Sequence, residues 1–216
     1  MAMKFALIED QVMFRSMLRR LLVEECKGKV VFEAGSLTEL RENFPLLATV
    51  DLLLLDIRLP DGDGLDVVDE LTSQRLAVPV LLLSSSCEDY IVHRVGRSFV
   101  QGFVHKDEET KVLLTAIQMA AAGGTFFSPR FTERKRALSN GAESFATLLS
   151  AREQEVLRQI GAGLTDREVA AKLGISASTA QTHRRNVMEK LSLHTARDVQ
   201  TYALKAGFTT MDRLQQ

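Results

Sequence analysis

Residues 51–64 read DLLLLDIRLPDGDG, and this stretch decides the fold of the first half of the chain. Four consecutive leucines lead to Asp56, so the run is apolar on both faces instead of alternating with polar residues. A strand of this kind is typical of a parallel sheet that helices cover on both sides. We therefore take residues 51–55 as a central strand and search outward for its neighbours.

Similar apolar runs recur along the first 124 residues and are separated by segments with helical periodicity. The other predicted strands are residues 5–8, 29–34, 78–83 and 102–104. The predicted helices are residues 12–25, 37–47, 65–72, 89–98 and 110–122. Five strands interleaved with five helices predict an α/β, flavodoxin-like (βα)5 domain with a parallel five-stranded sheet and right-handed crossovers.

The second half of the chain has a different pattern. Residues 128–147 hold Pro129, a basic cluster and Ser139-Asn140-Gly141, and we interpret them as a linker with one helical turn. From Leu148 the pattern is helical throughout, with capping signals before each helix. The predicted capping residues are Ser150, Thr165, Ser176 and Thr195.

Composition excludes several classes of protein. The chain has 216 residues, 45% of them apolar and 25% charged, which is typical of a soluble protein with two domains. It has neither an apolar run of membrane-spanning length nor a recognisable signal peptide, so we expect it in the cytoplasm. Its two cysteines fit neither a metal site nor a disulfide framework. Residues 1–126 carry a net charge of −6 and residues 148–216 a net charge of +3, which indicates different partners for the two halves.

Polar residues follow four of the predicted strands, at the edge where ligands of open parallel sheets bind. They are Glu9-Asp10, Asp56, Ser84 and, through His105, Lys106. Three close carboxylates need a cation, and an all-oxygen ligand set with open water positions suits Mg²⁺. A carboxylate beside Mg²⁺ can act as a nucleophile on a phosphoryl group, while an ammonium neutralises the phosphoryl oxygens.

These residues, together with residues 56–64, resemble the receiver domain of two-component systems over residues 4–123. The resemblance implies that Asp56 is the phosphoacceptor, Ser84 the switch hydroxyl and Lys106 the phosphate-binding amine. It implies Phe103 as the switch aromatic. It also implies that Asp10, Asp56 and the backbone carbonyl of Arg58 bind Mg²⁺, with Glu9 acting through water.

Two positions depart from the pattern of that family. Phe99-Val100 stand where Gly-Ala is usual, and His105 stands where an apolar residue is common. We expect His105 to be a hydrogen-bonded or solvent-facing residue in preference to a pH sensor. The departures bear on signal transmission more than on phosphorylation.

Residues 165–191 predict a short helix, a tight turn at Gly174-Ile175-Ser176 and a longer helix, which is the helix-turn-helix arrangement. The exposed face of the longer helix would carry long polar donors, which suit a DNA major groove. A solvated face on an interaction module is the plainer alternative. The donors are Ser178, Gln181, Thr182, Arg184, Arg185, Asn186 and Lys190.

Residues 149–191 resemble the LuxR-type domain, in motifs such as Leu149-Ser150-Ala151-Arg152-Glu153 and Glu168-Val169-Ala170. With the receiver-like half, the chain resembles a NarL/FixJ-family response regulator. The resemblance implies a receiver domain over residues 3–124, a linker over 125–147 and an all-α, four-helix DNA-binding domain over 148–211. It implies that Gln181, Thr182 and Arg185 face base edges, and that phosphates are approached by Ser178, Thr179, Arg184, Asn186 and Lys190.

One departure concerns the DNA surface. Family members often carry Val-Lys where this chain has Ala180-Gln181, which removes a positive charge. Gln181 can read adenine or merely contact a phosphate, and the sequence leaves both open. The fourth helix, residues 196–206, either forms a dimer contact on DNA, as the family implies, or only closes the domain core.

The resemblance implies a regulator in which Mg²⁺-dependent phosphorylation of Asp56 by a sensor histidine kinase promotes a homodimer on a two-part DNA site. Such a protein accepts a phosphoryl group without being a turnover enzyme. One alternative is a regulator that binds DNA independently of phosphorylation, with the receiver as an interaction domain. A Mg²⁺-dependent phosphohydrolase is disfavoured because Arg58 stands where a general acid is needed. RNA binding is disfavoured because aromatic residues are scarce in the helical half.

Overall fold

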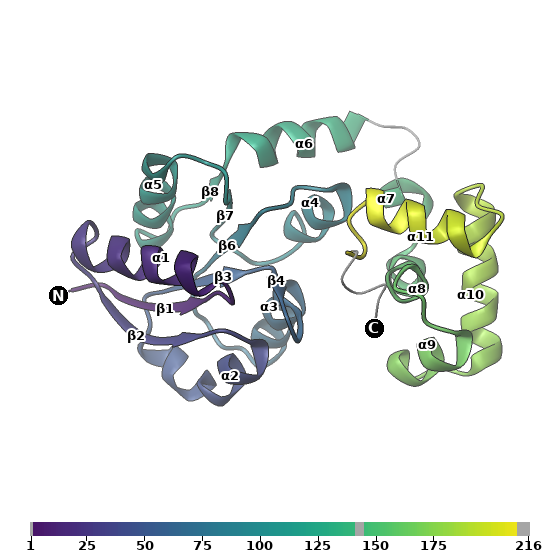
Figure 1. The fold of residues 1–216 in the computed structure, drawn as a ribbon, viewed down its shortest axis with the longest axis horizontal. Coiled ribbons are helices and arrows are strands. Elements are labelled where there is room, and N and C mark those ends of the chain that lie inside the picture. The colour runs from purple at the N-terminus through teal and green to yellow at the C-terminus, as the bar shows by residue number, and fades with distance from the viewer. Residues whose placement is uncertain (1, 141–144, 211–216) are drawn as a thin grey trace. The chain divides into compact units, whose positions relative to one another are not determined.

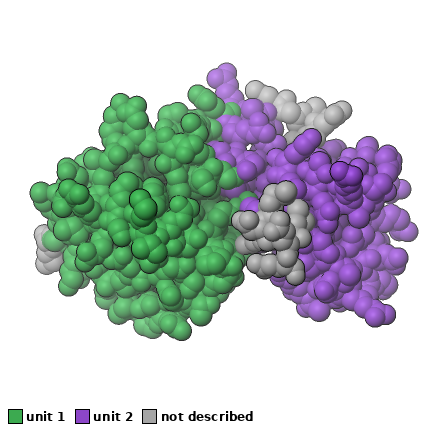
Figure 2. All heavy atoms as spheres, in the orientation of Figure 1, with its two compact units in different colours: residues 1–86, 94–133 green, residues 87–93, 134–216 purple. Residues whose placement is uncertain are grey.

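The computed structural model describes residues 2–140 and 145–210, which fall into two compact units (Figure 2). Unit 1 comprises the residues up to Ser86 together with Arg94–Glu133. Unit 2 comprises Cys87–His93 together with the residues from Arg134 onward. Residues 141–144 of the predicted linker and residue 211, the predicted end of the second domain, lie outside the described residues.

Unit 1 is built on a parallel sheet with the strand order β2-β1-β3-β6-β7-β8 (Figure 1). The predicted strands are present as β1 (Lys4–Ile8), β2 (Lys29–Ala34), β3 (Leu52–Asp56), β6 (Val80–Ser84) and β7 (Gly102–His105). The short strand β8 (Phe126–Phe127) pairs in parallel with β7 and adds a sixth strand that the sequence did not predict. The parallel α/β class is therefore confirmed, with one extra edge strand.

Helices cover both faces of this sheet (Figure 1). On one face, α1 (Val12–Glu24) and α5 (Thr110–Ala121) bury side chains such as Leu18, Leu22 and Ile117 in one cluster with the β-strand leucines. On the other face lie α2 (Leu37–Glu42) and α3 (Gly64–Ser73). All five residues of β3 are buried, as a strand between two helical layers requires.

Two segments differ from their predicted form. The single helix expected over residues 37–47 is α2 followed by a 3₁₀ helix, η1 (Phe44–Thr49), because Pro45 cannot donate the next helical hydrogen bond. The linker, expected to hold one helical turn, instead contains β8, the 12-residue helix α6 (Pro129–Asn140) and the start of α7 (Phe145–Leu148). The short hairpin of β4 (Arg58–Leu59) and β5 (Gly62–Asp63) follows β3.

Unit 2 is helical, and its principal helices are α8 (Ala151–Gly161), α9 (Asp166–Leu173), α10 (Ala177–Lys190) and α11 (Ala196–Lys205). The predicted caps are present, and Ser150, Thr165 and Thr195 each form a capping box. Gly174 ends α9 in the left-handed conformation, at φ 64° and ψ 37°, so the chain turns directly into α10. This is the predicted helix-turn-helix.

The core of unit 2 gathers apolar side chains from all four of these helices. Val199 and Ala203 of α11 are buried in it, so the apolar stripe of this helix closes the core. Residues 87–93, which include the start of α4 (Asp89–Val95), also belong to unit 2. There the ring of Tyr90 stacks 4.1 Å from that of Phe208.

No helix in the described part of the chain is long and apolar enough to cross a membrane.

Candidate functional site

Glu9, Asp56 and Lys106 meet at the edge of the unit 1 sheet where β1, β3 and β7 end. The Lys106 ammonium lies 2.6 Å from a carboxylate oxygen of Asp56 and 2.7 Å from one of Glu9. Glu9 and Asp56 are buried, whereas the neighbouring Asp10 is exposed. One carboxylate oxygen from each of the three acidic residues lies within 4.8 Å of the other two. The structure thus brings together Glu9, Asp10, Asp56 and Lys106, four of the strand-end residues that the sequence singled out.

Burial and mutual repulsion perturb these acids. The pKa of Glu9 is raised from 4.5 to about 7. Burial contributes most to this rise and the charge of Asp56 adds to it, whereas Lys106 opposes it. Burial also raises the pKa of Asp56 against the lowering effects of Lys106 and of the Arg58 N–H. For Lys106, burial disfavours the ammonium, but Asp56 and Glu9 outweigh it and raise the pKa. One ammonium therefore leaves part of the acidic charge of the cluster uncompensated.

The donor set at this edge fits a divalent cation. It offers carboxylate oxygens from Glu9, Asp10 and Asp56, and the exposed side of Asp10 leaves room for water ligands. Oxygen ligands and retained water are what Mg²⁺ prefers. The backbone of Arg58 lies beside the same cluster, because its N–H donates to an Asp56 oxygen at 3.1 Å.

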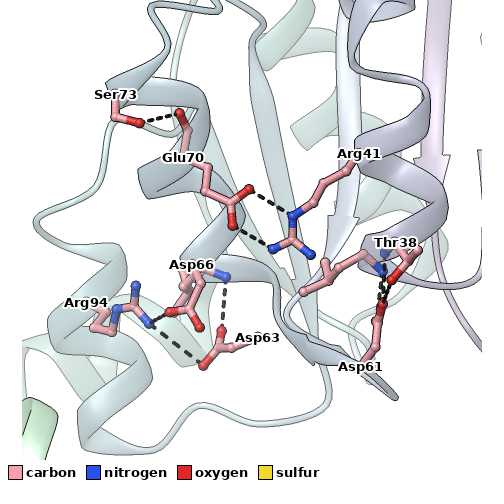
Figure 3. A network of polar contacts seen from close by, with 10 residues as sticks. Thr38, Arg41, Asp61, Asp63, Asp66, Glu70, Ser73 and Arg94 are labelled. Carbon is pink, nitrogen blue, oxygen red and sulfur yellow. Dashed lines mark hydrogen bonds and ion pairs between the residues drawn. The ribbon is translucent and has the colours of Figure 1, made fainter. Parts of the chain in front are cut away.

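The loop after Asp56 is fixed by hydrogen bonds to its neighbours (Figure 3). Gly64 can only be glycine, because a Cβ there would collide with the carbonyl oxygen of Asp56. Asp63 caps α3 by accepting the Leu65 N–H at 2.9 Å. Asp61 faces away from the cluster and accepts the N–H groups of Leu37 and Thr38. These contacts hold the position of the loop without using the oxygens of Asp56.

Arg94 of α4 reinforces the same region. Its guanidinium lies 3.8 Å from an oxygen of Asp63 and donates to Asp66 at 2.9 Å, as Figure 3 shows, and it also pairs with Asp69. The Arg94 side chain is 15% exposed, so these pairs are partly shielded from solvent. They tie Arg94 to the first two turns of α3.

Ser84 lies on β6, the strand next to that of Asp56, and Phe103 lies on β7, one strand further along the sheet. Both are fully buried, and Ser84 accepts the Ser86 N–H through its hydroxyl at 3.1 Å. Ser84 and His105 are partners across β6 and β7. His105 is nearly buried and accepts the Asp107 N–H on Nδ1 at 3.2 Å, so it is hydrogen-bonded, one of its two expected states.

Two residues of α1 support the cluster and were not predicted. The ring of Phe14 lies with its centroid 4.9 Å from the Lys106 ammonium, a cation–π contact. Arg15 donates to the backbone carbonyl of Glu9. The sequence could have indicated them by position, because they lie four and five residues after Asp10, in the first turns of a predicted helix.

The predicted DNA-reading residues lie on α10 of unit 2, and most of them are exposed. Gln181, Thr182 and Arg185 are exposed, as are Ser178 and Thr179, whereas Asn186 is half-buried. Gln181 and Arg185 border a hollow of the surface whose lining also includes His194 of the loop that follows α10. The side chains of this face are therefore accessible from solvent.

Two residues predicted to approach phosphates, Arg184 and Lys190, also form ion pairs within unit 2. Arg184 donates to a carboxylate oxygen of Asp166 at 2.6 Å and to the carbonyl oxygen of Leu164 at 2.9 Å. Lys190 lies 2.8 Å from a carboxylate oxygen of Glu153, which also belongs to the capping box of α8. Both cations therefore hold α10 against its neighbouring helices.

Comparison with known families accounts for both units. The family model described as the response regulator receiver domain matches residues 5–118. A second model, described as bacterial regulatory proteins of the luxR family, matches residues 147–203. Together the two models cover the residues that form the carboxylate cluster and the helix-turn-helix.

Individual relatives give the same result. The Fimbriae Z protein of Escherichia coli K12 is 35% identical over 71% of this chain and 74% of its own length. The transcriptional regulatory protein UhpA of the same strain is 30% identical over 87% of this chain and 91% of its own. The nitrate/nitrite response regulator protein NarP is 29% identical over 87% of each chain.

Solved structures support the fold. The structure of the two-component response regulator RcsB in complex with DNA matches with a TM-score of 0.64 at 22% identity, covering 95% of this chain and 99% of that one. At this level of identity the likeness shows a shared fold and carries no further conclusion.

Proposed function

Because this chain belongs to the response regulators that join a receiver domain to a LuxR-type DNA-binding domain, we propose that phosphorylation of Asp56 controls its binding to DNA. The observation that carries the proposal is the buried contact of Lys106 with both Asp56 and Glu9 at the ligand-binding edge of the sheet. Regulators of this family are transcription factors and not turnover enzymes.

The chemistry proposed for Asp56 is phosphoryl transfer. A carboxylate oxygen of Asp56 forms a bond to phosphorus while the bond from phosphorus to the donor breaks, which gives an acyl phosphate. With acetyl phosphate the leaving group is acetate. With a phosphohistidine of a sensor kinase, the imidazole nitrogen keeps the electron pair of the broken bond. Lys106 stays beside the transferred group, where its ammonium offsets the charge of the phosphoryl oxygens.

We propose that Asp10, Asp56 and the Arg58 carbonyl hold Mg²⁺, with Glu9 acting through water. The ion would neutralise charge on the phosphoryl oxygens and on the clustered acids. The raised pKa values of Glu9 and Asp56 support a cation requirement, because both acids ionise against burial.

The switch proposed for the phosphorylated state involves Ser84 and Phe103. The new phosphoryl charge beside β3 would draw the Ser84 hydroxyl into a hydrogen bond, and the buried ring of Phe103 on the adjacent strand would move into the space released. Both residues are fully buried on neighbouring strands, so a shift of one is felt by the other.

For DNA, we propose that Gln181, Thr182 and Arg185 face base edges, and that Ser178, Thr179 and Asn186 approach phosphates. Arg184 and Lys190 reach phosphates only if they leave Asp166 and Glu153. One short helix reads few bases, so we propose that a homodimer binds a two-part site. Since the DNA of a bacterium lies in its cytoplasm, the proposal places the protein there.

The experiment that tests the proposal exposes the full chain to acetyl phosphate and Mg²⁺ and measures its intact mass. We expect one phosphoryl group on the wild-type protein and none on Asp56→Asn. Asp61→Asn is the matched control, because Asp61 lies in the same loop but faces α2, and it should be phosphorylated normally. Stable labelling of Asp56→Asn would place the phosphoacceptor elsewhere.

A further inference from the structure

The first turn of α6 is built onto the end of β7, next to the carboxylate cluster. Phe127 of β8 pairs with Phe103 of β7, and the Ser128 N–H donates to the Phe103 carbonyl oxygen at 2.9 Å. The helix begins one residue later, at Pro129. Its start is therefore positioned by β7, the strand that leads directly into Lys106.

Aromatic packing strengthens this attachment. Phe131 of α6 is 1% exposed, and its ring centroid lies 4.9 Å from that of Phe103 and 5.0 Å from that of Phe127. Aromatic pairs at this separation contribute beyond their buried area. Phe131 is the buried side chain of this first turn, so the rings of Phe103 and Phe127 form the surface of unit 1 on which the turn packs.

Polar contacts reach the same stretch of chain. Arg130 donates to a carboxylate oxygen of Asp107 at 3.1 Å, and the same guanidinium nitrogen lies 3.4 Å from Nδ1 of His105. Between them, Lys106 holds Asp56 through its ammonium and donates its N–H to the carbonyl oxygen of Ser84 at 2.8 Å. Residues 103–107 thus connect the carboxylate cluster to the start of α6.

We propose that α6 is the element that responds to phosphorylation of Asp56, and that its first turn loosens when Phe103 withdraws from Phe131. The reason is geometric: a phosphoryl group on Asp56 becomes the new partner of the Lys106 ammonium in place of the Asp56 carboxylate oxygen, and any resulting shift of residues 103–106 alters the surface on which Phe131 packs. This inference rests on the proposed function. It gives α6 a specific role, because the chain passes from unit 1 into unit 2 within this helix, between Glu133 and Arg134.

The test is amide hydrogen exchange of the full wild-type chain with Mg²⁺, with and without acetyl phosphate. We expect the amides of residues 129–136 to exchange about two- to tenfold faster with the donor, the factor that corresponds to loss of one aromatic pair. Asp56→Asn should show no change. Intact mass is measured on the same samples. An unmodified wild-type protein would defeat the proposed function, whereas a modified protein with unchanged exchange in α6 would overturn this inference alone.

A pair of variants sharpens the result. Phe131→Leu keeps an apolar side chain but removes the ring contact, so exchange in α6 should already be fast without the donor and rise little with it. Phe126→Leu is the matched control. The ring of Phe126 packs on the hydrophobic core of unit 1, so the change in exchange with the donor should persist in this variant. A full donor response in Phe131→Leu would contradict the role of Phe131. If this variant does not fold, the comparison of the wild type with and without the donor still tests the proposal.

Discussion

Lys106 in unit 1 and Lys190 in unit 2 each pair with a glutamate, at 2.7 Å with Glu9 and 2.8 Å with Glu153. The Lys106 side chain is 8% exposed and its glutamate is fully buried, whereas the Lys190 side chain is 43% exposed. Lys106 also serves a second carboxylate, that of Asp56. The same chemical pair therefore occurs in two different environments.

The difference reflects two tasks. A site that transfers a phosphoryl group gains from buried, pre-positioned charges, because electrostatic interactions are stronger there than in water. A surface that binds a long polyanion needs side chains that reach solvent, such as Arg185 of α10. Unit 1 shields the charges of Glu9, Asp56 and Lys106 from solvent. Unit 2 leaves the candidate reading face of α10 exposed, while Arg184 and Lys190 hold the helix.

The largest expected effect comes from removal of the buried cation. Lys106→Met leaves Glu9 and Asp56 close together without a counter-ion, so in the absence of divalent cations the free energy of unfolding of unit 1 should fall by about 3 kcal/mol near neutral pH. Hydrogen exchange of the β3 and β6 amides in the full chain measures this loss. A loss under about 1 kcal/mol would mean that this cluster behaves like an exposed ion pair.

An intermediate effect should separate two adjacent arginines of α10. Arg185→Ala should weaken binding to duplex DNA by about 1–3 kcal/mol and, if Arg185 also neutralises a phosphate, lower the salt slope by about 1. Arg184→Ala removes contacts to Asp166 and the Leu164 carbonyl, so it should mainly lower the stability of unit 2. Titration of the two variants at several salt concentrations distinguishes them. A salt slope that is lowered equally in both variants would place Arg184 on the DNA surface as well.

The smallest effect concerns Lys190 and the pH dependence of unit 2. Although partial burial opposes it, the hydrogen bonds from Lys190 and from Ser150 hold the pKa of Glu153 below its ordinary 4.5. A lowered pKa in the folded state stabilises the fold above pH 4.5, and this contribution is lost as the pH falls through the lower folded value.

In Lys190→Met, the free energy of unfolding of unit 2 should fall by under about 1 kcal/mol at neutral pH and decline less steeply with acid. Hydrogen exchange of the α8 amides between about pH 3 and about pH 6 would show this, since this range includes the ordinary pKa of 4.5 of the Glu153 carboxyl. An acid dependence identical to that of the wild type would mean that Ser150 alone sets the pKa of Glu153.

Local sequence signals predicted the parts of the molecule that local forces determine. The capping residues Ser150, Thr165 and Ser176 each accept the backbone N–H three residues on, as predicted. The convergence of Asp56 and Lys106 followed from the rule that the ends of parallel strands share one edge. In both cases the prediction used only chain periodicity and residue type.

What could not be predicted depends on tertiary contacts. Nothing in the spacing of α10 distinguishes Arg184, which turns to Asp166, from Arg185, which is exposed. The linker was interpreted from its Pro, Ser, Asn and Gly content. The first turn of its helix α6 is stabilised by the packing of Phe131 on the rings of Phe103 and Phe127, which the content of the linker does not reveal. The spacing of four residues between Phe127 and Phe131 indicated that the two rings could pack together. It could not show that Phe103 completes the contact, because that depends on the tertiary structure.

The measurement that tests the central claim most directly is selection from a random-sequence DNA pool by mobility shift. It uses the full chain with Mg²⁺, with and without acetyl phosphate, beside Asp56→Asn. We predict a selected two-part site that the wild type binds more tightly with the donor, and no donor effect in Asp56→Asn. Equal binding of that site by unphosphorylated protein and by protein shown to carry a phosphoryl group on Asp56 would contradict the account. Unit 1 would then be an interaction domain beside an independent DNA-binding unit.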